Sequence, residues 1–188
     1  MELQGERLIP ASQEKTWLAL NDPEVLKACI TGCESLERTG DDAYAALVAV
    51  KVGPVSARFK GNLKLSNVQA PNSYTINFDG QGGVAGFGKG SADVTLSPEG
   101  SGTRLKYLAK AQVGGKMAQV GSRLIDAAAA KVAEDFFKAF EAQLAPPAAV
   151  PADAGQLPTP ADTPKSNRAL WWGVGVLVLL LLWYWLSR

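Results

Sequence analysis

The sequence contains few of the residues that usually perform catalysis or bind metal. It has no histidine among its 188 residues, which excludes the commonest general base, the commonest metal ligand and any Ser–His or Cys–His mechanism. Its two cysteines, Cys29 and Cys33, are separated by three residues, but a zinc site needs about four ligands. We therefore predict no metal site and interpret the cysteines as small buried residues, with a redox or metal role as the alternative.

Residues 83–89, GVAGFGK, have the spacing of a phosphate-binding loop. Gly90 follows where that loop has Ser or Thr, and the next segment alternates like a strand instead of beginning a helix that would face a phosphate. We therefore predict no nucleotide site. The glycines permit bends and close backbone approach at the mouth of a pocket, and Phe87 among them is either a core plug or a gate.

Charge is balanced in the part of the chain before residue 146. Residues 1–145 hold sixteen Lys and Arg and sixteen Asp and Glu, because three of the nineteen basic and two of the eighteen acidic residues lie beyond them. A near-neutral domain without a basic cluster beside an aromatic stripe is not typical of nucleic-acid binders. We interpret Arg58, Lys60, Lys89 and Lys106 as charges of a solvated face, with a patch for a partner as the alternative.

Alternation of apolar and polar residues predicts an antiparallel sheet. Every second residue over 55–65 is apolar or small and the residues between are polar, which is the period of a strand with one buried face. The pattern recurs between turns that contain Gly, Pro or Asn, so sequential strands form a meander. The other strands are predicted at 3–10, 44–52, 74–78, 92–96 and 105–113.

Two short helices and one long helix complete the predicted elements. Ser12 is placed to cap a helix over 13–20, and Asp22 followed by Pro23 is typical of a second helix start. After two glycines at 114–115 the apolar spacing becomes helical. The predicted apolar face of the long helix comprises Met117, Val120, Leu124, Ala128, Val132, Phe136 and Phe140, with Leu144 at its end.

A long apolar helix face needs an apolar surface to cover it, and the sheet offers one. We predict an α+β, helix-grip fold, in which the antiparallel sheet wraps around the C-terminal helix. The helix is uneven, because Phe136, Phe137 and Phe140 lie toward its end whereas residues 127–130 are all alanine. Either the sheet closes onto the alanines, or a hydrophobic small molecule occupies the space that they leave.

The chain ends in a segment that is suited to a lipid bilayer. Residues 169–186 carry no charge and would span roughly 27 Å as a helix, close to the hydrocarbon thickness of a bilayer. We predict a single transmembrane helix here, with a buried core helix as the alternative. Aromatic side chains suited to the two interfaces stand near its ends, namely Trp171, Trp172, Trp183, Tyr184 and Trp185.

Residues 145–168 connect this segment to the rest and contain six of the eleven prolines, a composition typical of a linker. The N-terminus has no basic stretch leading into an apolar one, so no export signal is evident. We expect a domain over 1–144 on the cytoplasmic side of the cell membrane, held by a C-terminal anchor.

Six segments occur in an order that is typical of one family, namely DPE at 22–24, CITGCESLE at 29–37, VGPVSARFKG at 52–61, GFGKGSA at 86–92, VGGKMAQVGSRLI at 113–125 and FF at 136–137. Together they resemble the CoxG family of carbon monoxide dehydrogenase accessory subunits. The resemblance covers roughly residues 1–144, with one small departure at Thr31, where the family often has proline. The family belongs to the START-like (SRPBCC) superfamily, whose fold usually encloses a deep apolar pocket.

The resemblance implies a non-catalytic accessory protein that recruits a molybdenum hydroxylase, such as carbon monoxide dehydrogenase, to the membrane and carries quinone. It implies no covalent cofactor, only a quinone or another lipid as bound ligand. Two alternatives stay open: a membrane-docking adaptor with a closed core, and a START-like enzyme of the cyclase or hydrolase type. Without histidine, such an enzyme would need Asp, Glu, Tyr or Lys as its acid and base.

The expected pocket lies between the inner face of the sheet and the long helix. Three tyrosines, Tyr44, Tyr74 and Tyr107, fall on that face, and each buried hydroxyl needs a partner. They are either ordinary core residues or one of them donates to a quinone carbonyl. The other predicted lining residues are Val48, Phe59, Leu63, Ile76, Phe78, Phe87, Val94, Leu96, Met117, Val120, Leu124 and Ala128.

Overall fold

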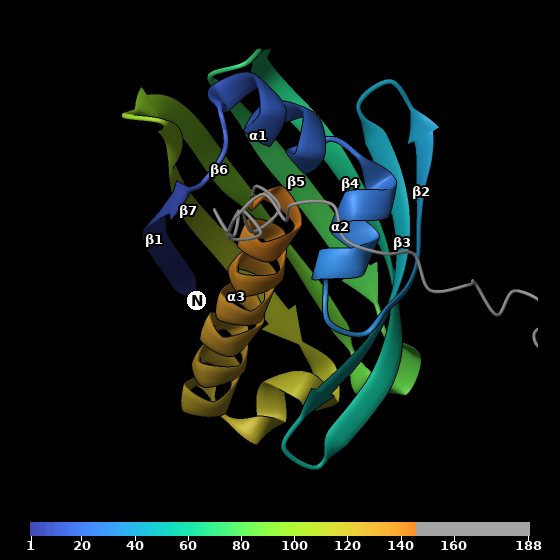
Figure 1. The fold of residues 1–188 in the computed structure, drawn as a ribbon. Coiled ribbons are helices and arrows are strands. Elements are labelled where there is room, and N and C mark those ends of the chain that lie inside the picture. Colours follow the sequence, from blue (N-terminus) through green and yellow to red (C-terminus); the bar gives the residue numbers. More distant parts are fainter. Residues whose placement is uncertain (146–188) are drawn as a thin grey trace, which may run out of the picture. The chain divides into compact units, whose positions relative to one another are not determined.

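The computed structural model describes residues 1–145. They form a seven-stranded antiparallel sheet in the order β1-β7-β6-β5-β4-β3-β2, which curves around one long helix, as Figure 1 shows. The elements in chain order are β1 (Glu2–Ile9), α1 (Gln13–Leu20), α2 (Pro23–Cys29), β2 (Cys33–Gly40), β3 (Ala43–Val52), β4 (Val55–Gln69), β5 (Ser73–Gln81), η1 (Gly83–Ala85), β6 (Phe87–Glu99), β7 (Gly102–Gly114), η2 (Gly115–Val120) and α3 (Ser122–Leu144).

Both short helices begin where the capping residues predict. The Ser12 hydroxyl accepts a hydrogen bond from the Lys15 backbone N–H at 3.3 Å, and the Asp22 carboxylate accepts one from Glu24 at 2.9 Å. Pro23 occupies the first turn of α2, where its missing N–H costs no helical bond. These two helices cover the end of the sheet where α3 finishes (Figure 1).

The predicted strands are present, and the sheet has one more. The extra strand is β2, which pairs with β3 at the edge of the sheet. Only Leu36 is buried within it, so it lacks the apolar alternation on which the prediction depends.

The start of α3 and its buried face differ from the prediction. Met117 and Val120 belong to the 3₁₀ turn η2, and α3 begins at Ser122. The predicted face is wrong at Leu124 and Val132, each 48% exposed. A four-residue spacing advances about 40° per step around a helix of 3.6 residues per turn, so the predicted stripe turns away from the sheet. The half-buried residues at this end of α3 include Ile125, Ala129 and Ala133.

The packed core lies toward the C-terminal end of α3. Phe140 is fully buried and stacks on Phe136 with ring centroids 5.6 Å apart. Phe137 stacks on Tyr107 of β7 at 5.2 Å. Leu144, only 5% exposed, extends the same buried face. The predicted role of these phenylalanines, which is to fill the space between helix and sheet, is confirmed at this end of the helix.

Two fully buried threonines provide a matched pair for a stability measurement. Thr103 donates a hydrogen bond to the carbonyl of Ala11 at 2.7 Å, whereas the buried Thr16 hydroxyl has no partner within residues 1–145. We expect Thr16→Val to stabilise the fold by about 1 kcal/mol and Thr103→Val to destabilise it by a similar amount, because an unpaired buried hydroxyl is costly and a paired one is not. Urea unfolding of both variants tests this, and equal effects would contradict it.

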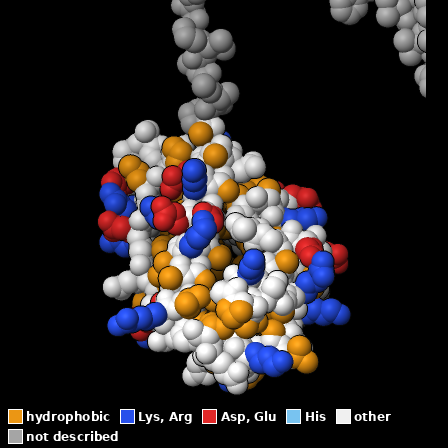
Figure 2. All heavy atoms as spheres, turned by 90° about the horizontal axis from the view of Figure 1, so that it is seen from below, with side chains coloured by type: hydrophobic (Ala, Val, Ile, Leu, Met, Phe, Trp, Pro, Cys, Tyr) orange, Lys and Arg blue, Asp and Glu red, His pale blue; other side chains and the backbone are white. Residues whose placement is uncertain are grey.

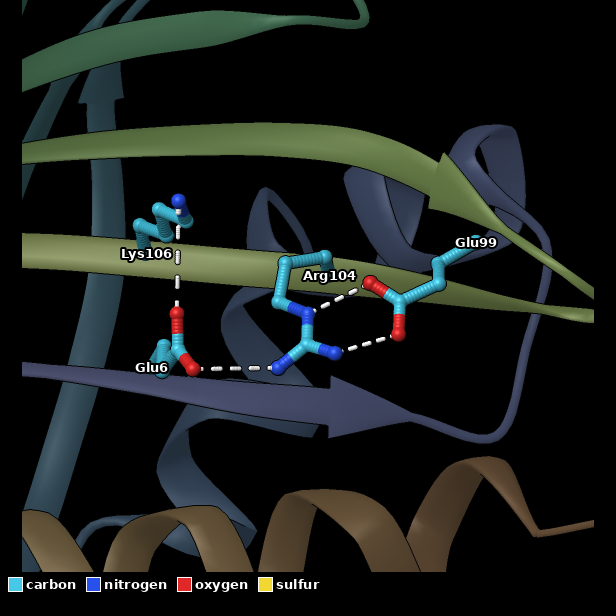
Figure 3. A network of polar contacts seen from close by, with 4 residues as sticks. All are labelled: Glu6, Glu99, Arg104 and Lys106. Carbon is cyan, nitrogen blue, oxygen red and sulfur yellow. Dashed lines mark hydrogen bonds and ion pairs between the residues drawn. The ribbon is translucent and has the colours of Figure 1, made fainter.

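A polar network on the outer face joins the edge strand β1 to its neighbours. The Arg104 guanidinium pairs with Glu99 and with Glu6 at 3.1 Å, and Glu6 lies 4.0 Å from Lys106 (Figure 3). The hydrogen bonds from Arg104 hold the pKa of Glu99 below its usual range. Lys106 is largely exposed in this network, as a charge of the solvated face.

The predicted linker over 145–168, apart from its first residue, and the predicted membrane segment over 169–186 lie outside the described residues. Within residues 1–145, we find no helix with the length and apolarity that crossing a bilayer requires.

Candidate ligand-binding site

One row across the inner face of the sheet carries almost no side chains. The strand register aligns Val113 of β7, Gly88 of β6, Gly80 of β5, Gly61 of β4 and Ala46 of β3. Three neighbouring glycines in this row leave the sheet bare at its centre. The sequence contains each of these residues, but only the register brings them together.

The space above this row is open at Gly88. A Cβ atom built on Gly88 would meet no atom within 4 Å. The long helix α3 also has small side chains, since residues 127–130 are all alanine. Of these, Ala128 and Ala129 are half-buried. Sheet and helix thus each have a stretch with few or small side chains. We call the resulting space the hollow, and Figure 2 looks into it from its open end, past hydrophobic side chains.

The predicted lining residues divide into two groups. Tyr44, Tyr74, Val94 and Leu96 belong to the packed core, each no more than 8% exposed. Leu63, Ile76 and Tyr107 are partly buried against that core. Residues nearer the open end of the sheet are less covered, since Val48, Phe59 and Phe78 are all half-buried. The structure thus separates a closed end from an open end.

Aromatic rings lie against glycines on this open half of the sheet. The Phe59 ring lies 2.6 Å from where a Cβ of Gly82 would be, and Phe78 lies 2.9 Å from that of Gly90. A larger residue at Gly82 would displace the Phe59 ring, and one at Gly90 would clash with the Lys110 carbonyl as well as with Phe78. The glycines therefore allow the rings to lie flat and form an apolar wall while the space above Gly88 stays free.

A groove of about 540 Å³ opens at the side of the domain. It lies between the end of β7 and the start of α3, where Val113 faces Ser122 and Ile125, and Phe87 also lines it. This volume falls within the usual range for small-molecule sites. Ile125 is not among the predicted lining residues, because the predicted stripe of the helix passes through its neighbour Leu124.

Phe87 is not a core plug. It is 40% exposed. Its ring lies against Gly114, the last residue of β7, so closely that a Cβ atom on Gly114 would clash with the ring. Leu124 holds a comparable position on the other side, with its side chain 3.2 Å from the Cβ position of Gly53 in the β3–β4 turn. Met117 is buried, whereas Val120 is half-buried. The open end of the hollow is thus bordered by large apolar side chains.

The tyrosine hydroxyls differ in their availability. Tyr44 donates to the carbonyl of Asn21 at 3.2 Å and accepts from Arg38 at 2.9 Å, so its hydroxyl is engaged by the fold. Burial raises the pKa of Tyr74, which keeps that phenol protonated, and its ring packs edge-on against Trp17. Tyr107 lies over Gly5 and stacks on Phe137.

The polar groups that we find do not converge on the hollow. Within residues 1–145, no three His, Cys, Asp or Glu side chains come together as metal ligands. A larger depression of about 930 Å³ lies on the outer face, where Asn77, Asp79, Lys89 and Ser91 contribute to its lining. Its charged and amide groups suit water better than a lipophilic molecule.

The cysteines are both free thiols. Burial raises the pKa of Cys29 and of Cys33, the latter offset in part by the charge of Lys27. The folded chain therefore holds the two thiol protons more tightly than the unfolded chain does. The stability that the buried thiols contribute is fully present below the ordinary thiol pKa, and it declines as the pH rises through the raised pKa.

We therefore expect slow reaction of both thiols with a disulfide reagent at pH 7.5, with half-exposed Cys33 reacting before Cys29, which is 2% exposed. Kinetics of labelling in native buffer and in urea test this. Fast reaction of Cys29 in the native chain would instead indicate a redox role.

The comparisons with known proteins agree with this geometry. The family model described as CoxG, the G subunit of carbon monoxide dehydrogenase, matches residues 5–145. The chain belongs to this family. Because the match spans β1 to the end of α3, the hollow lies entirely within the part of the chain that the family shares. A search of curated proteins found no match.

Solved structures show the same fold. A conserved protein from Geobacillus kaustophilus is 30% identical, with a TM-score of 0.72 over 77% of this chain and 95% of that one. A START superfamily protein from Mycobacterium smegmatis is 17% identical, with a TM-score of 0.57 over 76% and 96%. A protein from Thermus thermophilus is 20% identical, with a TM-score of 0.59 over 77% and 97%. The CoxG domain is therefore a START-like α+β fold.

Proposed function

We propose that this CoxG protein is a non-catalytic accessory protein, anchored in the cell membrane by residues 169–186 with its domain on the cytoplasmic side. It binds a lipophilic ligand, a quinone, in the hollow. It thereby couples a molybdenum hydroxylase such as carbon monoxide dehydrogenase to the membrane. The family supports the partner, and the uncharged C-terminal segment supports the anchor.

The observation that carries the proposal is the bare row with open space above Gly88. Protein interiors normally pack as densely as organic crystals, so a fold that leaves such a space next to apolar walls gains from an apolar occupant. A quinone tail in water costs about 0.8 kcal/mol for each exposed CH₂ group, and the half-buried Val48, Phe59 and Phe78 offer it an apolar surface.

Extraction of the purified full chain with organic solvent, followed by mass spectrometry, tests ligand binding. We expect the unaltered chain to release a stoichiometric amount of quinone or lipid. The variant Gly88→Leu, whose leucine fills the hollow, should release less. Both proteins carry the same C-terminal segment, so lipid held there cancels in the comparison. Equal amounts from both would contradict ligand binding in the hollow.

Coupling is tested separately. Vesicles that contain decylubiquinone and the full chain should accept electrons from purified carbon monoxide dehydrogenase faster than vesicles without the chain, and Gly88→Leu should remove the difference. If Gly88→Leu accelerates transfer as well as the unaltered chain, the protein is a docking adaptor that needs no ligand.

A further inference from the structure

The open end of the domain combines exposed apolar side chains with basic ones. Val84 in η1 is 85% exposed, Leu124 is 48% exposed and Phe87 is 40% exposed. Apolar side chains this exposed on adjacent turns are costly unless something covers them. Figure 2 views this end and shows hydrophobic and basic side chains close together around the hollow.

The charges at this end are mostly positive. Segments 50–60, 80–90 and 112–126, which form it, contain six Lys and Arg and a single acidic residue, Asp126. One of the six, Arg58, is paired with Glu34 at 2.7 Å. Lys51, Lys116 and Arg123 are exposed beside the apolar group. We call Val84, Phe87, Leu124, Lys51, Lys116 and Arg123 together the basic tip.

Two carboxylates next to these segments, Glu34 paired with Arg58 and Asp79 opposite Lys89, reduce the positive excess but do not cancel it. Other acidic residues lie at the far end of the sheet. The β2–β3 turn carries Asp41 and Asp42, and Glu99 ends β6, at the other end of the sheet from the basic tip. The basic tip is therefore positively charged, although the domain as a whole holds equal numbers of basic and acidic residues. Such a distribution orients a protein toward an anionic surface.

We infer that the basic tip docks on the surface of an anionic bilayer, with Val84, Phe87 and Leu124 inserted at headgroup level and Lys51, Lys116 and Arg123 against lipid phosphates. Apolar side chains among basic ones are the combination that binds such interfaces.

The tip also borders the groove at the side of the domain. Phe87 lines that groove together with Ile125 of α3. Docking would turn this groove toward the lipid, so that a ligand passes between bilayer and hollow without crossing water. This consequence rests on the proposed function, whereas docking itself does not.

A fluorescent probe at the tip tests docking in the full chain. Cys33→Ser leaves only the buried Cys29, and Val84→Cys then carries an environment-sensitive fluorophore. The protein is reconstituted into phosphatidylcholine vesicles with or without phosphatidylglycerol, with brominated acyl chains as quencher. The control carries the probe at Ser101→Cys, in the turn at the opposite end of β6.

We expect quenching at position 84 in anionic vesicles and little at position 101. High salt, or the combined change Lys51→Glu, Lys116→Glu and Arg123→Glu, should weaken it roughly tenfold. Equal quenching at both positions, or none at position 84, would overturn docking. Burial of the probe only on addition of carbon monoxide dehydrogenase would instead assign the tip to a protein partner.

Binding of decylubiquinone in detergent micelles separates this inference from the proposed function. The charge variant keeps every residue of the bare row and should bind the quinone like the unaltered chain. Loss of that binding would place the basic residues in the ligand site and overturn their assignment to lipid. If instead the unaltered chain binds no quinone yet docks, the proposed function fails and docking stands.

Discussion

Replacing Gly88 by leucine is expected to weaken binding of decylubiquinone by at least roughly tenfold while leaving the fold intact. The side chain enters the hollow at a position where a Cβ meets no atom within 4 Å, and it occupies the space that the ligand needs. Removing a glycine from a strand also lowers the entropy of the unfolded chain, which favours folding by up to about 1 kcal/mol.

The matched control is Thr95→Leu, which adds a leucine to the same strand on its exposed outer face. Quinone titration followed by fluorescence, together with thermal unfolding, separates occlusion from destabilisation. Unchanged binding by Gly88→Leu, or equal losses in both variants, would mean that the hollow is not the site.

Replacing Phe140 by alanine is expected to destabilise the domain by about 3–5 kcal/mol. The side chain is fully buried and stacks on Phe136, so its removal leaves a cavity at the centre of the packed end. That loss is a large part of the stability of an ordinary domain.

Phe87→Ala serves as the comparison, because Phe87 is 40% exposed at the open end. This substitution should lower the free energy of unfolding by less than about 1 kcal/mol. Urea unfolding followed by circular dichroism measures both. If Phe87→Ala lowered the stability as much as Phe140→Ala, the open end would belong to the packed core. That result would contradict the division into a closed end that stabilises the fold and an open end that binds the ligand.

Much of this fold could be predicted from the sequence because its signals are local. Ser12 and Asp22 cap helices through their own neighbours, and alternation along 55–65 needs only the strand itself. The sequence also predicts the contrast between the alanines at 127–130 and the phenylalanines beyond them, which is the origin of the hollow on the helix side.

The sheet side of the hollow could not be predicted, because it depends on register. Gly61, Gly80 and Gly88 lie far apart in the chain, and only pairing of three strands aligns them. The edge strand β2 lacked a signal because one residue, Leu36, is buried in it. The helix phase was wrong at Leu124 because a four-residue spacing gradually rotates around the helix.

The most direct test of the central claim is to locate a bound quinone on the chain. An azido-quinone analogue is added to the reconstituted full chain and irradiated, and peptide mass spectrometry maps the adducts. We predict adducts on the inner-face residues of β5 and β6 and on the alanine stretch of α3, and their loss in Gly88→Leu. Adducts confined to the outer face, or unchanged in Gly88→Leu, would contradict the claim that the hollow holds the ligand.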